Sequence, residues 1–299
     1  MKRLMSLLVG ALLMVCALLL AACGTGGGSV VVGSANIPEQ LLLGSMYAMA
    51  LEDAGLPVTK RLNIGAREVY FPALRNGEID VFVEYLGSTY SYLSGLSGAQ
   101  PEVLTEVDDL RTAISGLLPG DLVLLESSTA QNQDALAVTA QTAQRFNLEA
   151  VSDLAPVAGQ LVAGGPPEEK TRRTGLQGLR DVYGIQFKDF IVVTAGPQTI
   201  EALKSGRIQV GRVFTTDAFL EPEGLVVLKE DKPLIPAENV TPIVRKEALS
   251  PEAAQTLNAV SEALTTDKLI ALNKRVQIDK DDPETVARDF LVSEGLISG

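Results

Sequence analysis

Two stretches, ALRNGEIDV at positions 73–81 and ALKSGRIQV at positions 202–210, share one pattern that decides the fold. Each contains the end of a helix, a glycine able to take a positive φ, and a strand, in the same order. One such unit can arise by chance. Two units in separate halves of the chain predict two lobes of similar build.

The residues around the first stretch alternate between strand and helix patterns. Runs rich in β-branched residues predict short strands, and apolar residues at helical spacing predict helices. Pro38 fits the first turn of a helix, and Gly55 is a suitable stop. We expect strands at residues 30–33, 58–62 and 79–83, with helices at residues 39–54 and 67–76 between them. This β-α-β-α-β order is typical of a parallel, doubly wound sheet.

The alternation returns in the second half, and the C-terminal third is helical. Ser250-Pro251 and Asp282-Pro283 each place a capping residue before a proline at the first helical position. The C-terminal helices are expected to pack back onto the first lobe, and YSYLSG at positions 90–95 predicts a surface loop. Helices are expected at residues 175–183, 197–205, 251–264, 267–276 and 283–294, and strands at residues 190–194 and 208–214.

These elements predict two α/β lobes joined by crossing strands. We assign residues 30–130 and 238–299 to lobe 1 and residues 131–237 to lobe 2. Ligands of open α/β sheets bind beyond the carboxyl ends of the strands, so the ligand cleft is expected between the lobes.

The N-terminus predicts export. Two basic residues at positions 2 and 3 precede an apolar run at residues 7–20, which is shorter than the roughly 20 residues of a membrane-spanning helix and fits a secretory signal. The string LAACG at positions 20–24 resembles a bacterial lipobox, in which Cys23 is acylated. Residues 1–22 would then be a lipoprotein signal peptide, and the Gly-rich residues 23–29 a flexible tether. An ordinary signal peptide with an incidental cysteine is the alternative.

Composition excludes several classes of function. With 25 Lys+Arg against 37 Asp+Glu and no cluster of basic and aromatic residues, nucleic acid and anionic lipid are poor partners. The chain has no histidine, Cys16 lies in the leader, and Cys23 would be acylated. Histidine-based triads, zinc sites and thiol nucleophiles are therefore excluded, and no P-loop, G-x-G-x-x-G or G-x-S-x-G motif is present. We expect no enzyme, cofactor or metal site. A carboxylate-driven hydrolase is the enzyme alternative, but no pair of acids is singled out.

Several strings, in one order along nearly the whole mature chain, identify a family. The chain resembles the glycine betaine/choline/carnitine-type osmoprotectant-binding proteins of ABC importers. The resemblance implies a two-lobed α/β periplasmic-binding-protein type II fold, with a mixed sheet in each lobe, that closes on a ligand. The matching strings are EQ (39–40), MYA (46–48), RE (67–68), AL-x-x-GEID (73–80), EYLGS (84–88), ALAV (135–138), SDL (152–154), FTTD (214–217) and VL-x-x-DK (227–232).

The resemblance also implies site residues. In this family a box of Tyr rings holds a trimethylammonium group by cation–π contacts, and an Arg with small hydroxyl groups holds a carboxylate. The residues carried over are Tyr85 as a box ring, Ser88 at the hydroxyl position, Arg172 as the ligand-gripping Arg, Glu168 as its acidic partner, and Thr216 and Asp217 in a Ser/Thr-Thr-Asp string near the cleft.

Other positions depart from the family pattern. Asp134, Ile200 and Glu223 stand where the family usually has box tyrosines, and Ala35 replaces a common Lys. Each ring contributes roughly 0.5–2 kcal/mol to a bound cation, so losing three would cost ~3–5 kcal/mol. A quaternary ammonium ligand therefore does not follow from the resemblance alone.

Two alternatives remain open for the ligand. In the first, Asp134 and Glu223 accept hydrogen bonds from an amino, guanidino, imidazole or polyol solute. In the second, other aromatic residues rebuild the cage; the candidates are Tyr70, Tyr90, Tyr92, Phe214 and Phe219.

The sequence thus predicts a solute-binding component of an ABC importer that is exported and anchored by lipid at Cys23. Its expected partners are a small-molecule solute, the ABC permease with its ATPase subunits, and the membrane at the anchor. We expect a monomer. A ligand-sensing lipoprotein is the remaining alternative, since the fold does not separate sensing from transport.

Overall fold

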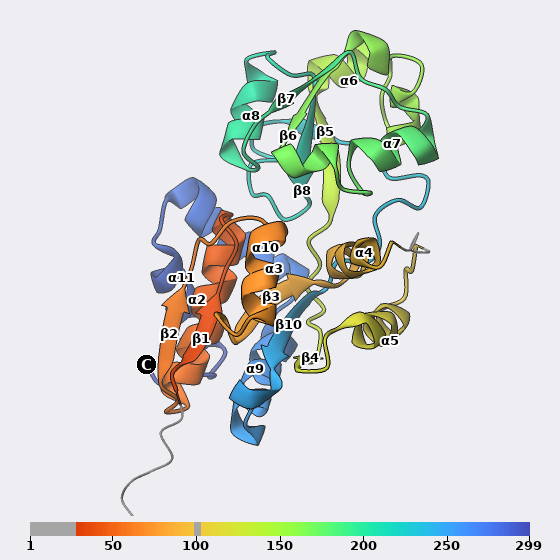
Figure 1. The fold of residues 1–299 in the computed structure, drawn as a ribbon. Coiled ribbons are helices and arrows are strands. Elements are labelled where there is room, and N and C mark those ends of the chain that lie inside the picture. Colours follow the sequence, from red (N-terminus) through yellow and green to blue (C-terminus); the bar gives the residue numbers. More distant parts are fainter. Residues whose placement is uncertain (1–27, 99–102) are drawn as a thin grey trace, which may run out of the picture.

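The computed structural model describes residues 28–98 and 103–299, so the predicted leader, Cys23 and most of the tether lie outside the described residues. Two five-stranded sheets form two lobes, which lie one above the other in Figure 1. The first sheet contains β1 (Val30–Gly33), β2 (Val58–Arg61), β3 (Val81–Tyr85), β4 (Leu122–Leu124) and β10 (Val240–Arg245), and the second contains β5 (Asp134–Thr139), β6 (Val162–Gly165), β7 (Asp189–Val192), β8 (Val210–Phe214) and β9 (Leu225–Val227).

The two sheets have the same topology. Their strand orders are β2-β1-β3-β10-β4 and β7-β6-β8-β5-β9. In each, three parallel strands are followed by an antiparallel strand, β10 or β5, that arrives from the other lobe. The two repeated stretches lead into β3 and β8, which hold the same central place. Gly77 and Gly206 have φ values of 75° and 72°, so the predicted positive φ is confirmed at both.

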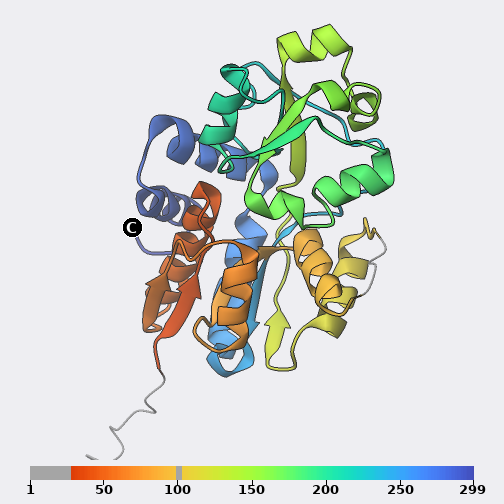
Figure 2. The same ribbon diagram turned by 45° about the horizontal axis from the view of Figure 1, so that its top comes forward.

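Helices cover both sheets. The C-terminal helices pack on α2 of the first lobe, with Leu257 and Val286 in the same core cluster as Leu42 and Met46. This packing confirms the prediction, and Figure 2 shows these helices beside α2 and reaching the second lobe. The helices of the first lobe are α2 (Pro38–Asp53), α3 (Arg67–Arg75), α4 (Leu86–Leu96), α5 (Val107–Leu117), α9 (Pro251–Ala263), α10 (Thr266–Lys274) and α11 (Pro283–Ser293), with η4 (Lys246–Ala248) and a π-helical turn η5 (Arg275–Asp279). Those of the second are α6 (Ala140–Phe146), α7 (Leu176–Tyr183), α8 (Pro197–Lys204) and the 3-10 turns η1 (Val151–Leu154), η2 (Ala158–Gln160) and η3 (Pro167–Lys170).

The prediction of a surface loop at residues 90–95 was wrong, because this stretch belongs to α4. Leu86, Thr89 and Leu93 are buried at helical spacing. Tyr92 contacts the ring of Phe71, with 5.1 Å between the ring centres. The Ser and Gly content is typical of a loop, but this buried face stabilises the helix.

Two extended connections join the lobes and run side by side. Asn132 N–H donates to the carbonyl oxygen of Glu238 at 3.1 Å, and Val240 N–H donates to that of Ala130 at 3.0 Å. These hydrogen bonds pair the segment that leads into β5 with the one that leads into β10. In the part of the chain that the structure describes, no helix is long and apolar enough to cross a bilayer.

Candidate ligand cleft

A cavity of about 230 Å³ lies between the two lobes. It is smaller than the roughly 300–1,000 Å³ pockets of drug-sized ligands, so it suits a compact solute. Both lobes contribute side chains to it. This agrees with the expectation that the ligand cleft lies between the lobes. The residues used below are Arg67, Tyr70, Tyr85 and Ser88 from the first lobe, Asn132 from a connection, and Asp134, Glu168, Arg172 and Phe214 from the second.

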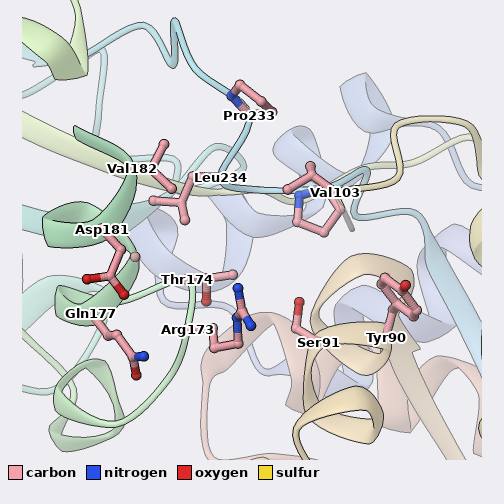
Figure 3. A pocket seen from close by; sticks show the side chains of 12 residues that line it. Tyr90, Ser91, Val103, Arg173, Thr174, Gln177, Asp181, Val182, Pro233 and Leu234 are labelled. Carbon is pink, nitrogen blue, oxygen red and sulfur yellow. The ribbon is translucent and has the colours of Figure 1, made fainter. Parts of the chain in front are cut away.

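A smaller hollow of about 70 Å³ lies beside this cleft, between α4 and α7 (Figure 3). Tyr90 and Ser91 face it from the first lobe, and Gln177 and Asp181 face it from the second. The 230 Å³ cavity has more than three times this volume and contains the positions that the family resemblance implied, Tyr85, Ser88 and Arg172. We therefore take it as the candidate site and call it the main cavity.

Three aromatic rings line the main cavity, namely Tyr70, Tyr85 and Phe214. Tyr70 stacks on Phe82 with the ring centres 3.7 Å apart, and its hydroxyl donates to Glu84 at 2.8 Å. The Tyr85 hydroxyl donates to Glu39 at 2.5 Å. Burial raises the pKa of both tyrosines, so both stay neutral phenols. Since their hydroxyls are engaged, they offer the cavity their rings.

Arg67 lines the cavity but is already paired. Its Nε and Nη2 donate to the two carboxylate oxygens of Glu84 at 3.0 and 2.8 Å, and both side chains are buried. A bidentate pair of this kind fixes the guanidinium in one orientation. Glu84 lies on β3 and also accepts from Tyr70, so the pair supports the wall of the cavity.

Arg172 forms an ion pair across the cleft. Its Nε and Nη2 each lie 3.1 Å from an oxygen of Glu68, which belongs to α3 of the opposite lobe. Burial alone would raise the pKa of Glu68, but the hydrogen bonds and charge of Arg172 hold it below its usual value. The acidic partner of Arg172 is thus Glu68 rather than the expected Glu168, whose backbone carbonyl instead accepts from the Arg172 N–H.

Asp134 and Glu168 both line the cavity. Asp134 is the first residue of β5, and Glu168 lies in η3. The next residue, Glu169, is buried and accepts from Arg212 Nη2 at 2.7 Å, which anchors η3 to β8. Because Glu169 holds this turn in place, Glu168 is positioned at the cavity.

Ser88 lines the cavity, but its donors are used by the protein. Its N–H and Oγ–H donate to the carboxylate of Glu238 at 3.0 and 2.7 Å. Burial raises the pKa of Glu238 to about 8. Ser88 therefore ties the start of α4 to a connection between the lobes.

Thr216 and Asp217 lie behind the cavity wall in a network around Glu39, a carboxylate that is only 3% exposed. The side chains that donate to it come from both lobes, a connection and α10; they are Tyr85, Asn132, Thr216 and Asn273. Asp217 accepts from the Phe214 N–H at 3.0 Å, and burial raises its pKa to about 7. This network was not predicted, although Glu39 stands in the first string that identified the family.

Two positions that depart from the family pattern lie away from the main cavity. Ile200 is buried in the core of the second lobe with Val193 and Leu203. Glu223 forms an ion pair of 2.7 Å with Lys204. Neither is among the described residues that line the cavity. Of the other candidate rings, Tyr70 and Phe214 line the cavity, whereas Tyr90, Tyr92 and Phe219 do not.

Comparisons with known proteins agree with this architecture. Residues 28–293 match the family described as the substrate binding domain of ABC-type glycine betaine transport systems. The glycine-betaine-binding protein of Pseudomonas aeruginosa is 30% identical over 98% of this chain and 96% of its own length. The carnitine transport binding protein OpuCC of Listeria monocytogenes is 26% identical over 100% and 99% of the two chains.

Solved structures show the same fold. A glycine betaine/carnitine/choline ABC transporter structure has a TM-score of 0.70 at 24% identity and covers 90% of this chain and 100% of its own. Lactococcal OpuAC, in its closed form with glycine betaine, has a TM-score of 0.62 at 18% identity and covers 90% and 97%. These matches confirm the two-lobed α/β fold of type II periplasmic binding proteins. The chain belongs to the OpuAC family, the substrate-binding domains of ABC-type glycine betaine transport systems.

Proposed function

We propose that the cavity between the lobes binds a compact solute with a quaternary ammonium group and delivers it to an ABC permease. The observation that carries this proposal is the lining, in which Tyr70, Tyr85 and Phe214 come from both lobes and two carboxylates stand beside them. Rings attract a cation that cannot donate hydrogen bonds, and carboxylates add long-range attraction. The cage is thus rebuilt from rings other than the three replaced by Asp134, Ile200 and Glu223.

Closure on the ligand follows from where these groups lie. A solute that contacts Tyr85 on β3 and Phe214 on β8 bridges the lobes, so it binds the closed form better than the open form. This closed form would dock on the permease, whose ATPase subunits supply the energy. This role requires binding and release of the solute and no chemical turnover. We propose that the protein is a monomer, exported and held to the membrane through Cys23. Its lobes would comprise residues 30–130 with 238–299 and residues 131–237.

One observation favours a second ligand class. Asp134 lines the cavity, and its carboxylate would accept a hydrogen bond from an amino, guanidino or imidazole group. The affinity for such a ligand would depend on Asp134 more than on the aromatic rings.

The test is calorimetric titration of the chain without its leader. Phe214→Leu should weaken the binding of choline or tetramethylammonium by roughly 2- to 30-fold, because one ring contributes about 0.5–2 kcal/mol. Phe219→Leu, outside the cavity, is the matched control and should leave the dissociation constant unchanged. Binding of an amine that Asp134→Asn abolishes and Phe214→Leu spares would favour the second class instead.

A further inference from the structure

If the cavity binds compact ammonium compounds, its charged side chains decide which of them it accepts, and the inference therefore rests on the proposed function. Glycine betaine and carnitine carry a carboxylate, and choline does not. A carboxylate in the ligand needs a cationic side chain whose donors are available. Whether the charged side chains of the cavity already have partners within the protein therefore decides between ligands with a carboxylate and ligands without one.

Both arginines that line the main cavity already have a bidentate carboxylate partner. Arg67 uses Nε and Nη2 on Glu84 within the first lobe. Arg172 uses the same two nitrogens on Glu68 across the cleft, at 3.1 Å each. Each guanidinium thus has its charge balanced and one planar edge occupied by the protein itself.

Two carboxylates of the cavity, unlike its arginines, have no such partner in the described part of the chain. Asp134 and Glu168 line the same cavity. Among the residues that the structure describes, none donates a hydrogen bond or contributes an ion pair to either carboxylate. The charged side chains that line the cavity are thus two arginines, each balanced by its own carboxylate partner, and two carboxylates without such a partner among the described residues, so the excess is negative.

A ligand carboxylate would meet this excess directly. To reach Arg172 it would have to share the guanidinium with Glu68 or displace it, close to Asp134 and Glu168. Like charges in a partly desolvated site repel strongly because the effective dielectric is low. An ammonium ion without a carboxylate meets a net attraction, because the charge of each lining arginine is balanced by its own carboxylate partner. Glu68 also belongs to the lobe opposite Arg172, so displacing it would remove a contact between the two lobes.

We propose that Glu68 is a specificity-determining residue, which occupies Arg172 in place of a ligand carboxylate and so selects compact ammonium ions that carry none. Choline and tetramethylammonium fit the resulting cavity, and glycine betaine is disfavoured. Asp134 and Glu168 supply the negative charge that faces the cation.

Calorimetric titration with choline, tetramethylammonium and glycine betaine tests the proposal. The wild-type chain should bind choline about tenfold or more tightly than glycine betaine, which corresponds to roughly 1.4 kcal/mol. Glu68→Gln frees Arg172, so the ratio of the two dissociation constants should shift about tenfold towards glycine betaine. The ratio is the readout, because loss of the contact across the cleft weakens closure on both ligands alike.

Glu78→Gln is the matched control, since Glu78 pairs with Arg61 at 3.1 Å on the same lobe and outside the cavity. It should leave the ratio unchanged. Arg172→Gln breaks the same contact across the cleft, so it should weaken choline binding about as much as Glu68→Gln does, without shifting the ratio towards glycine betaine. A selective loss of glycine betaine in this variant would show that Arg172 grips the ligand carboxylate and would contradict the inference. A wild-type preference for glycine betaine, or an unchanged ratio in Glu68→Gln, overturns the inference and leaves the proposed function standing. Binding of none of the three probes overturns both.

Discussion

Tyr85 and Glu39 are joined by a hydrogen bond of 2.5 Å that links the wall of the cavity to the buried network behind it. One side chain thereby serves two roles, with its ring lining the cavity and its hydroxyl satisfying a buried carboxylate. These roles can be separated by mutation.

Tyr85→Phe keeps the ring and removes the donor. Losing one hydrogen bond to a buried charged group should lower the free energy of unfolding by about 1–3 kcal/mol, while the affinity for choline changes little. Tyr85→Leu removes the ring as well and should raise the dissociation constant roughly 2- to 30-fold. Urea unfolding and calorimetry measure the two effects, with Tyr92→Phe as the control outside the cavity. Equal losses of affinity in both Tyr85 variants would assign binding to the hydroxyl rather than the ring.

Asp217 should make stability depend on pH. Its pKa is raised from 3.8 to about 7 by burial, so the folded state holds a proton between those values that the unfolded state has released. The contribution of Asp217 to stability should therefore fall as pH rises from about 4 to about 7, by roughly 4 kcal/mol at 1.36 kcal/mol per pKa unit.

Asp217→Asn removes this contribution to the slope, so the variant should match the wild type near pH 4 and exceed its stability by a growing margin up to about pH 7. Thermal unfolding between pH 4 and pH 9 measures the difference. Asp109→Asn, exposed on α5, should follow the wild-type curve. A variant whose curve runs parallel to the wild type would show that Asp217 is already ionised in the folded state.

Among the ion pairs of the cavity wall, Arg67–Glu84 is expected to lower the free energy of unfolding most when one partner is removed. Glu84→Gln leaves a buried guanidinium without its counter-charge and should destabilise the fold by about 3–5 kcal/mol. Replacing both residues, as in Arg67→Met with Glu84→Leu, should cost less than the single change, because neither charge is then left unpaired. Urea unfolding of both variants tests this order, and the reverse order would contradict it.

Glu39→Gln should disturb the contact between the lobes. Glutamine brings an NH₂ group towards side chains that already donate, so at least one of the four hydrogen bonds is lost. We expect a loss of about 3 kcal/mol or more of unfolding free energy, at roughly 1.5–3 kcal/mol per charged hydrogen bond. Glu52→Gln, exposed on the same helix, is the control. Small-angle scattering should also show a wider distribution of lobe separations in Glu39→Gln.

Local features of this protein could be predicted from its sequence. The helix starts at Pro251 and Pro283, the positive φ of Gly77 and Gly206, and the alternation of strands and helices in residues 30–85 depend on neighbouring residues, and the structure confirms them. The family resemblance placed Tyr85 and Asp134 at the ligand site, and both line the cavity.

The pairings that complete the site were not predictable in this way. Glu68 and Arg172 are separated by 104 positions, and Glu39 and Asn273 by 234. Periodicity carries no information about such distant partners. The family resemblance implied Glu168, one helical turn before Arg172, as its partner, whereas the structure pairs Arg172 with Glu68 of the other lobe.

The Glu39 network has a mechanical consequence. Because donors from both lobes, a connection and α10 converge on a single carboxylate, the lobes are held together beside the paired connections that join them. The ion pair of Glu68 with Arg172 is a separate contact between the lobes, made by α3 and the residues that follow η3. A small rotation of one lobe about the connections would keep the hydrogen bonds of Glu39 and break the ion pair of Glu68 with Arg172. The cleft would then open at that ion pair while the lobes stay joined at Glu39.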